Sequence, residues 1–321
     1  MLFLGVDGGN TKTIALACAG DGRITGHGRT GCSDVYSVDN DVAIAEIVRA
    51  AESAIAAAGG GHIACAYYSL AGADWPVDIA FYESELSRLI PAGRTIVVND
   101  AIGAIRCASD DGVGCSLVCG TGTAIGARAP DGRLWHVSWL ASPFFTIDLT
   151  RTVLDAAVRS ELGLMPPSVL PARVAAAYGE ADIAGAMERV TGRAPRPPRA
   201  SLGGLLLDCA AEGDELASER IGWVARENAA YLRAGARACG LGEPTPITLA
   251  GGVMRHASSL LVDALARALP GCELRRARRE PAHGALIAAL DEGGAGVMEL
   301  DDSALPGDLF ATARGSEPGG R

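Results

Sequence analysis

The chain has 321 residues, of which 49% are hydrophobic and only 5% aromatic, and its formal net charge is −10. This length is enough for about two domains with buried cores. The acidic balance excludes a surface for duplex nucleic acid, which needs clustered basic residues, and the basic run at 275–279 is better explained as a solvated edge. The nine cysteines are scattered singly, as expected of buried thiols in a reducing compartment.

Segments that would direct the chain to a membrane are not apparent in the sequence. Neither a charged-then-apolar leader before Leu2 nor an apolar run of about 18 residues occurs. We therefore expect a cytoplasmic protein that does not enter a membrane.

The first half of the chain reads as one α/β layer. β-Branched and apolar runs predict strands, apolar residues at helical spacing predict helices, and Asp21-Gly22 marks a hairpin. The expected elements are strands at 2–7, 13–19 and 23–29, a helix at 41–58, a strand at 63–70, a helix at 77–89, a strand at 95–100 and a helix at 101–108. Three antiparallel strands followed by alternating helices and strands predict a mixed sheet.

The second half repeats this opening order. Its expected elements are strands at 115–119, 124–129 and 134–139, helices over 146–240, a strand at 246–250, a helix at 257–269, a strand at 272–277 and a helix at 283–290. A Gly-Thr turn and an Asp-Gly turn again separate the three leading strands. The repeat indicates a duplication, with a first domain over 1–112, a second over 113–292 and a flexible tail over 293–321.

The turn after the first strand has the composition of a phosphate-binding loop. Glycine lets the backbone approach phosphates closely, amide and hydroxyl hydrogens can point at them, and Asp7 can hold Mg²⁺ through water. The candidate residues are Asp7, Gly8, Gly9, Asn10, Thr11, Lys12 and Thr13. The spacing of a Walker A loop is missing, and the stretch taken alone is equally explained as a tight hairpin.

A second turn of the same kind lies between the first two strands of the second half. It consists of Gly120, Thr121, Gly122 and Thr123. Two such turns that face each other across a cleft between domains can clamp one polyphosphate, so we expect ATP as the cofactor.

Two further strand ends carry candidate residues. Asp100 ends an apolar strand and is either the N-cap of the next helix or a base that takes a proton from an acceptor hydroxyl. Gly251, Gly252 and Val253 follow a buried strand. Adenine can lie against bare backbone there, or the glycines simply soften a strand-to-helix turn.

Five motifs in order resemble those of the BadF/BadG/BcrA/BcrD ATPase family, which includes N-acetylglucosamine kinase. They are Asp7-Gly8-Gly9-x-Thr11-Lys12-Thr13, Asn99-Asp100-Ala101, Gly120-Thr121-Gly122-Thr123, Ala250-Gly251-Gly252-Val253 and Pro281-Ala282-His283-Gly284-Ala285. The resemblance covers residues 1 to about 290 and implies an α/β fold of duplicated actin-like (ribonuclease H-like) domains, with mixed five-stranded sheets and an interdomain cleft. It also implies that both Gly-Thr turns bind ATP phosphates, that Gly251 and Gly252 border the adenosine, that Asp100 is the catalytic base and that the protein is a homodimer.

The acceptor side follows the family only in part. Residues 69–74 resemble its Gly/Ser-Leu-Ala-Gly-Ala-Asp segment, so Gly72 and Asp74 are expected to contact the substrate, together with Asn99 and Asp100. Asp34 stands where the family has a sugar-binding Asn. The Gly-Asp-Glu-Gly-Ser sugar loop of the amino-sugar kinases is replaced by Leu-Ala-Ser-Pro-Phe-Phe-Thr at 140–146.

The sequence therefore predicts a magnesium-dependent kinase that phosphorylates a hydroxyl of an amino sugar such as N-acetylglucosamine or glucosamine. The Asp34 carboxylate would favour the free ammonium of glucosamine. Two alternatives stay open. An ATPase activator of a partner enzyme would need a cluster-ligating cysteine pair, and the sequence offers no convincing pair. A degenerate nucleotide-binding regulator is consistent with the missing sugar loop but not with the retained Asp100.

Overall fold

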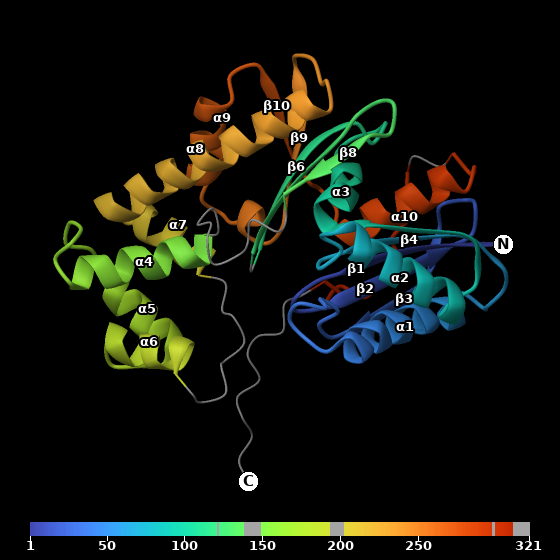
Figure 1. Cartoon of the computed structure of the whole chain (residues 1–321), viewed down its shortest axis with the longest axis horizontal. Coiled ribbons are helices and arrows are strands. Elements are labelled where there is room, and N and C mark those ends of the chain that lie inside the picture. Colours follow the sequence, from blue (N-terminus) through green and yellow to red (C-terminus); the bar gives the residue numbers. More distant parts are fainter. Residues whose placement is uncertain (121, 138–148, 193–201, 297–298, 311–321) are drawn as a thin grey trace, which may run out of the picture. The chain divides into compact units, whose positions relative to one another are not determined.

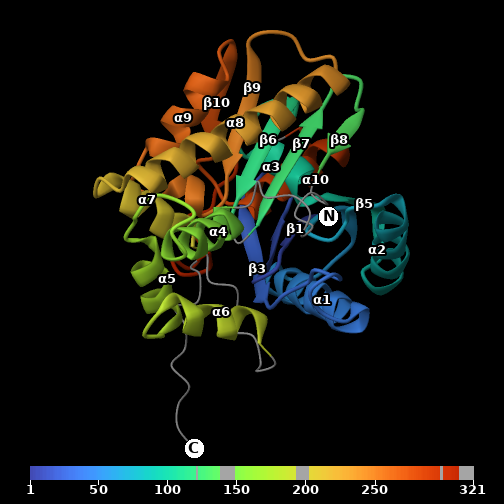
Figure 2. The same cartoon turned by 60° about the vertical axis from the view of Figure 1, so that its left-hand side comes forward.

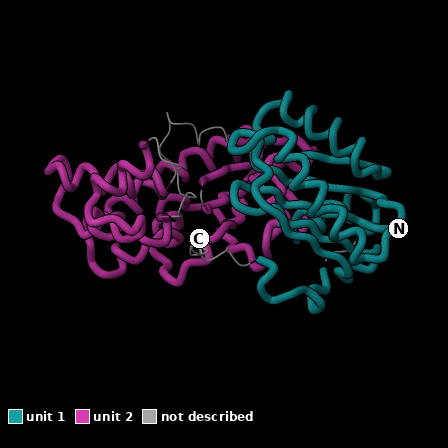
Figure 3. Tube along the Cα trace, turned by 90° about the horizontal axis from the view of Figure 1, so that it is seen from below, with its two compact units in different colours: residues 1–98, 282–321 teal, residues 99–281 magenta. Residues whose placement is uncertain are grey.

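The protein divides into two compact units, each built around its own sheet. The structure is a computed structural model that describes residues 1–120, 122–137, 149–192, 202–296 and 299–310. Unit 1 comprises Met1–Val98 and the described part of Ala282–Arg321, and unit 2 comprises Asn99–Pro281 (Figure 3). Among the described helices, none is both long and apolar enough to span a bilayer.

Unit 1 contains a five-stranded mixed sheet in the order β3-β2-β1-β4-β5. Its elements are β1 (Leu2–Gly8), β2 (Thr13–Cys18), β3 (Ile24–Thr30), α1 (Asn40–Ala57), β4 (Ile63–Leu70), α2 (Pro76–Leu89), β5 (Ala92–Asn99, whose last residue opens unit 2) and α10 (Pro281–Glu292, whose first residue closes unit 2). β1 runs antiparallel to β2 and parallel to β4. The strands and helices expected in this part of the sequence are thus confirmed, with ends shifted by up to three residues.

Helices cover both faces of this sheet, and glycines set the distance to each (Figure 1). A Cβ atom at Gly26 or Gly28 of β3 would lie 1.9 or 2.1 Å from a carbonyl oxygen of α1. On the opposite face, a Cβ atom at Gly5 of β1 would lie 2.2 Å from the backbone nitrogen of Leu286 in α10. Close backbone packing of this kind explains how a chain with so few aromatic residues builds a dense core.

Unit 2 repeats the sheet, in the order β10-β9-β6-β7-β8. Its elements are α3 (Asp100–Ala104), η1 (Ile105–Cys107), β6 (Gly114–Cys119), β7 (Thr123–Arg128), β8 (Leu134–His136), α4 (Leu149–Glu161), α5 (Leu170–Tyr178), α6 (Ile183–Thr191), α7 (Gly203–Ala211), α8 (Glu215–Ala238), β9 (Thr245–Ala250), η3 (Val253–Arg255), α9 (Leu260–Ala268) and β10 (Cys272–Arg276). Each sheet thus consists of three antiparallel strands followed by two strands added next to the first, which confirms the duplication.

Helix α8 lies across one face of the unit 2 sheet (Figure 2), and alternate side chains of the sheet contact different helices. Ser116, Gly126 and Thr248 face α3 and η1: the Ser116 hydroxyl donates to the carbonyl of Ala101 at 2.5 Å, and the Thr248 hydroxyl donates to that of Ile105 at 3.1 Å. The residues between them face α8 and the helices beyond it, and they join one continuous apolar core. The helix that begins at Asp100 is therefore fixed to the sheet by hydrogen bonds as well as by packing.

The division into units differs from the domain boundaries expected from the sequence. Residues 99–112 belong to unit 2, and α10 belongs to unit 1, where it packs against Gly5. Residues 299–310, which the sequence assigns to a flexible tail, also pack on unit 1: Leu300 and Leu309 are buried, at 4% and 5% exposed. Local composition cannot reveal these contacts, because they depend on a partner that is distant in the sequence.

We predict that Gly5→Ala destabilises the protein, because the new methyl group would displace α10 from the sheet. Overpacking of this kind costs about 1–3 kcal/mol of unfolding free energy, which urea denaturation would measure. Gly20→Ala is the matched control, since its Cβ atom would meet Phe3 at an ordinary 3.5 Å. Equal stability of the two variants would contradict this packing.

Candidate functional site

The first glycine turn closes on itself and is tied to the end of β4. The backbone N–H of Gly9 donates to the carbonyl of Lys12 at 3.0 Å, and that of Ala71 donates to the carbonyl of Gly8 at 2.8 Å. A Cβ atom at Gly8 would lie 2.5 Å from the Ser33 hydroxyl. A side chain at position 8 would thus have to displace Ser33, whereas a Cβ atom at Gly9 would meet nothing closer than 3.5 Å.

Thr13 braces this turn from inside the protein. Its hydroxyl lies 2.7 Å from the Ser33 hydroxyl and 2.9 Å from the Gly31 carbonyl, and the side chain is fully buried. Ser33 in turn donates its backbone N–H to the carbonyl of Gly9 at 3.1 Å. The Thr13 hydroxyl thus stabilises the turn and is occupied within the protein.

Lys12 is the only lysine in the sequence, in which all other Lys and Arg positions are arginine. Its ammonium group donates to the carbonyl of Phe310 at 2.6 Å and lies 5.9 Å from the centre of that ring. Lys12 was expected to bind phosphate, but the fact that it is the only lysine in the sequence had not been used as evidence. A compact ammonium group, unlike a planar guanidinium, acts as a point charge and suits a narrow turn.

The expected acceptor residues of unit 1 lie beside this turn. Asp34 is 6% exposed, and its carboxylate accepts hydrogen bonds from the backbone N–H of Tyr36 and from the Ser37 hydroxyl, each at 2.9 Å. The Ser37 oxygen also lies 2.5 Å from Oδ1 of Asn10. Gly72 has a φ of +83°, and a Cβ atom there would lie 2.5 Å from Oδ1 of Asp34. The structure thus brings together the segments that carry Asn10, Asp34 and Gly72, which are far apart in the sequence.

The Tyr36 hydroxyl contacts one carboxylate and lies near two more. It donates to Asp78 at 2.9 Å, and Asp78 also accepts from the backbone N–H of Trp75 at 2.9 Å. Desolvation, the hydrogen bond to Asp78 and the nearby charges of Asp74 and Asp34 raise the Tyr36 pKa to about 12. Sequence reasoning missed Tyr36 and Asp78. The available signal was the rarity of aromatic residues in this sequence, which made Tyr36 and Trp75 notable. Both side chains are exposed in the structure.

In unit 2 the second glycine turn meets the turn after β9. β6 and β9 are parallel neighbours with Val118 opposite Ala250, so both turns leave the same edge of the sheet. Gly251 has a φ of +93°, and a Cβ atom there would lie 2.2 Å from the carbonyl oxygen of Cys119. The side chain of Val253 packs towards Gly203 in α7 and is 6% exposed. Gly251 is thus required by the fold, and Val253 could contact a ligand only through its backbone.

The other glycines of these turns border open space. No heavy atom of the described residues would lie within 4 Å of a Cβ atom at Gly120, Gly122 or Gly252, apart from chain neighbours. Gly252 has a φ of −61°, which any residue can adopt. Contacts with the described residues therefore do not require glycine at these positions, and all three are at least partly exposed. Thr121 lies outside the described residues, and Thr123 is 4% exposed.

Asp100 is the first residue of α3. The N-cap is Asn99, whose side-chain oxygen accepts from the backbone N–H of Ala101 at 3.0 Å. Oδ1 of Asp100 lies 2.9 Å from the same N–H. Because Asn99 caps the helix and is 1% exposed, the capping role weighed for Asp100 is already filled, and the contact expected between Asn99 and substrate is not supported by an exposed side chain.

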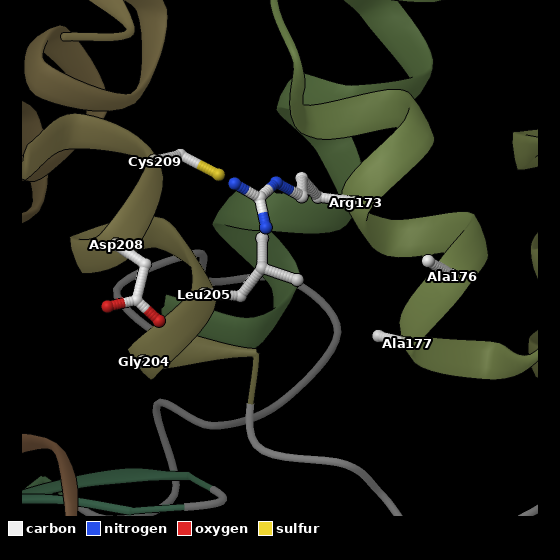
Figure 4. Close-up of a pocket in the computed structure, with 7 residues that line it drawn as sticks. All are labelled: Arg173, Ala176, Ala177, Gly204, Leu205, Asp208 and Cys209. Atoms are coloured by element: carbon white, nitrogen blue, oxygen red, sulfur yellow. The ribbon is translucent and has the colours of Figure 1, made fainter. Parts of the chain in front are cut away.

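A cavity in unit 2 lies away from all of these residues. It has a volume of about 380 Å³ and lies between α5 and α7, beside Arg173, Leu205 and Cys209 (Figure 4). Arg173 forms an ion pair with Glu212, and the pKa of the Cys209 thiol is raised, mainly by desolvation. The segment at 140–146 that replaces the sugar loop lies outside the described residues.

Solved structures of sugar kinases are similar to this chain over most of its length. A candidate N-acetylglucosamine kinase from Chromobacterium violaceum is 23% identical and has a TM-score of 0.68, with 90% of this chain and 98% of that one covered. A second one, from Porphyromonas gingivalis, is 20% identical with a TM-score of 0.68, covering 90% and 99%. A ROK family glucokinase from Streptomyces griseus, solved with glucose and AMPPNP, is 18% identical with a TM-score of 0.56, covering 91% and 99%. No family model and no curated protein matches the sequence.

The chain has the fold of these kinases. The expected duplicated actin-like fold, with two mixed five-stranded sheets, is thereby confirmed. At this level of identity the similarity shows the fold, and the activity has to be argued from the residues described above.

We predict that Gly251→Ala and Gly252→Ala separate the two kinds of glycine. Gly251→Ala should cost at least about 2 kcal/mol of unfolding free energy, because it forces a positive φ on alanine and a contact with the Cys119 carbonyl. Gly252→Ala should leave stability within about 0.5 kcal/mol. Denaturant unfolding would measure both, and a strongly destabilised Gly252→Ala variant would show that position 252 is required by the fold after all.

Proposed function

We propose that the protein is an ATP-dependent kinase that transfers the γ-phosphate to a hydroxyl group of an amino sugar. The observation that carries the proposal is the set of glycines whose backbone borders open space, Gly120, Gly122 and Gly252, at neighbouring strand ends. Glycine kept where packing does not require it is typical of backbone that a phosphate or a flat base must approach. The shared fold with sugar kinases supports the same reading.

The chain's own residues divide the work of such a transfer. The two glycine turns and the ammonium group of Lys12 would bind the phosphates, and the backbone at Gly251 and Gly252 would border the adenosine. The acceptor hydroxyl oxygen attacks the γ-phosphorus, Asp100 takes the hydroxyl proton, and ADP leaves with the electron pair of the broken bond. Hydrogen bonds fix α3 to its sheet, which supports Asp100 in this role because a catalytic base must be held in place.

Mg²⁺ would be held largely by the nucleotide itself. Among the described residues, no group of three His, Cys, Asp or Glu side chains is arranged to hold a metal ion. Mg²⁺ commonly binds through one or two carboxylates together with substrate phosphates and water. Asp7, at the end of β1 and at the start of the first turn, fits that pattern. When bound, the ion would neutralise charge that develops on the transferred phosphate.

The two alternative functions have less support. All nine cysteines are buried or half-buried, which does not favour the exposed cluster-ligating pair of an ATPase activator. A regulator without chemistry would have no use for a carboxylate on a fixed helix. A kinase is therefore the function we propose, and an assay of phosphate transfer distinguishes it from an ATPase activator and from a regulator.

Asp100→Asn should lower turnover by ~10²- to 10⁴-fold while nucleotide affinity is unchanged, because the amide cannot accept the hydroxyl proton. The assay is ADP release with Mg²⁺-ATP over a panel of amino sugars and related polyols, with phosphorylated product confirmed by mass spectrometry. Gly252→Ala is the companion variant, expected to fold normally but to bind nucleotide more weakly. Wild-type turnover in Asp100→Asn, or ADP release independent of every acceptor, would contradict the proposal.

The acidic surroundings of Tyr36 support a further choice among amino sugars. We expect glucosamine, which carries an ammonium group, to be used better than N-acetylglucosamine, because Asp34, Asp74 and Asp78 create a negative potential there. Asp34→Asn should shift the ratio of kcat/KM values towards the acetylated sugar by roughly tenfold, the effect of one hydrogen bond to a charged group. Equal or better use of the acetylated sugar by the wild-type protein would refute this choice.

A further inference from the structure

Residues 299–310, here called the C-terminal segment, are attached to unit 1 at their start through the backbone. The N–H of Asp301 donates to the carbonyl of Gly22 at 3.1 Å, and the N–H of Ile24 donates to the carbonyl of Asp301 at 3.0 Å. Nε2 of His283 in α10 lies 3.4 Å from the Asp302 carboxylate. These contacts fix the beginning of the segment beside the turn between β2 and β3.

The end of the segment is held by two cationic side chains. Arg29 donates to the carbonyls of Asp308 and Leu309 at 3.0 and 2.9 Å. Lys12 donates to the carbonyl of Phe310 at 2.6 Å and faces the ring of the same residue. Leu309, 5% exposed, is buried between these two contacts along the chain. The only lysine of the protein, in the proposed phosphate turn, is therefore engaged by the C-terminal segment.

We propose that the end of the C-terminal segment competes with nucleotide phosphates for Lys12 and so holds the nucleotide site in a state of lower affinity. The proposal rests on the proposed function only in naming ATP as the competing ligand. A neutral carbonyl and an aromatic face stabilise an ammonium group less than phosphate oxygens do, so nucleotide can win the competition. Nucleotide binding has to break the contacts between Lys12 and the segment, and the free energy lost with them lowers the affinity for nucleotide.

The segment can release Lys12 without detaching completely. The backbone pairing at Asp301 lies well before the contacts at 308–310, and the exposed residues Pro306 and Gly307 lie between them. The last residues can therefore move away from the phosphate turn while the first residues stay attached.

Leu309→Asp tests the proposal by removing the buried side chain that seats the end of the segment. Ala304→Asp is the matched control, since it adds the same charge at an exposed position of the same segment. Arg29→Gln is a second variant, which frees the carbonyls of Asp308 and Leu309 without changing the segment itself. Thermal unfolding of all three would establish that they are folded.

The first measurement is the rate at which an amine-acylating reagent modifies Lys12. Because the chain has one lysine, mass spectrometry of a single peptide reports it, separately from the N-terminal amine. The rate should rise roughly 3- to 10-fold in Leu309→Asp and Arg29→Gln but not in Ala304→Asp, as expected when a hydrogen bond to a charged group is lost. An unchanged or slower rate in both test variants would overturn the proposal.

The second measurement is the affinity for a non-hydrolysable ATP analogue with Mg²⁺, by calorimetry. Both test variants should bind it roughly 3- to 10-fold more tightly than the wild-type and control proteins. Unchanged or weaker binding in both test variants would overturn the proposal. Neither measurement uses an acceptor, so the result stands apart from the phosphotransfer assay: tighter binding without transfer to any acceptor would refute the proposed kinase and not this inference.

Discussion

Contact between backbone atoms at distances that only glycine permits is the constraint on which both units depend. Gly5 brings β1 against α10, and Gly251 brings the turn after β9 against the carbonyl of Cys119. A chain with few aromatic residues cannot fill wide gaps between layers, so its layers approach until backbone meets backbone. Small residues therefore decide how closely each helix approaches its sheet.

The same property separates two classes of glycine that look identical in the sequence. Gly251 is required by its positive φ and by its contact with the backbone of Cys119, whereas Gly120, Gly122 and Gly252 border space that no described residue occupies. The pair Gly251-Gly252 thus combines one position that shapes the turn with one that leaves the backbone bare. This division gives the motifs a physical basis that is independent of the resemblance to a family, because it follows from distances in this structure alone.

The sequence predicted the regular elements well because their signals are local. Both ends of β4 were predicted to the residue, and its apolar composition with two tyrosines is a property of the strand itself. Asn99 rather than Asp100 caps α3, because neighbouring polar residues compete for one role and only geometry decides between them. The membership of α10 in unit 1 and the burial of Thr13 depend on residues far away in the chain, so no local pattern reveals them. The segment at 299–310 was missed for a related reason: it is held largely through its carbonyl groups, which every sequence possesses.

Electrostatics link the candidate site to the rest of the chain. A protein with a net charge of −10 repels a polyanion at long range, so binding of phosphates has to rely on local positive potential. In unit 1 that potential comes from the amide groups of the first turn and from Lys12. Arg29, next to the same turn, is directed at the carbonyls of Asp308 and Leu309. The hydroxyl of Ser37 contacts both Asn10 and the Asp34 carboxylate. Asp34 in turn lies near Tyr36 and its partner Asp78. Asn10 and Ser37 thus lie between the turn that carries Lys12 and the carboxylates of Asp34 and Asp78 near Tyr36.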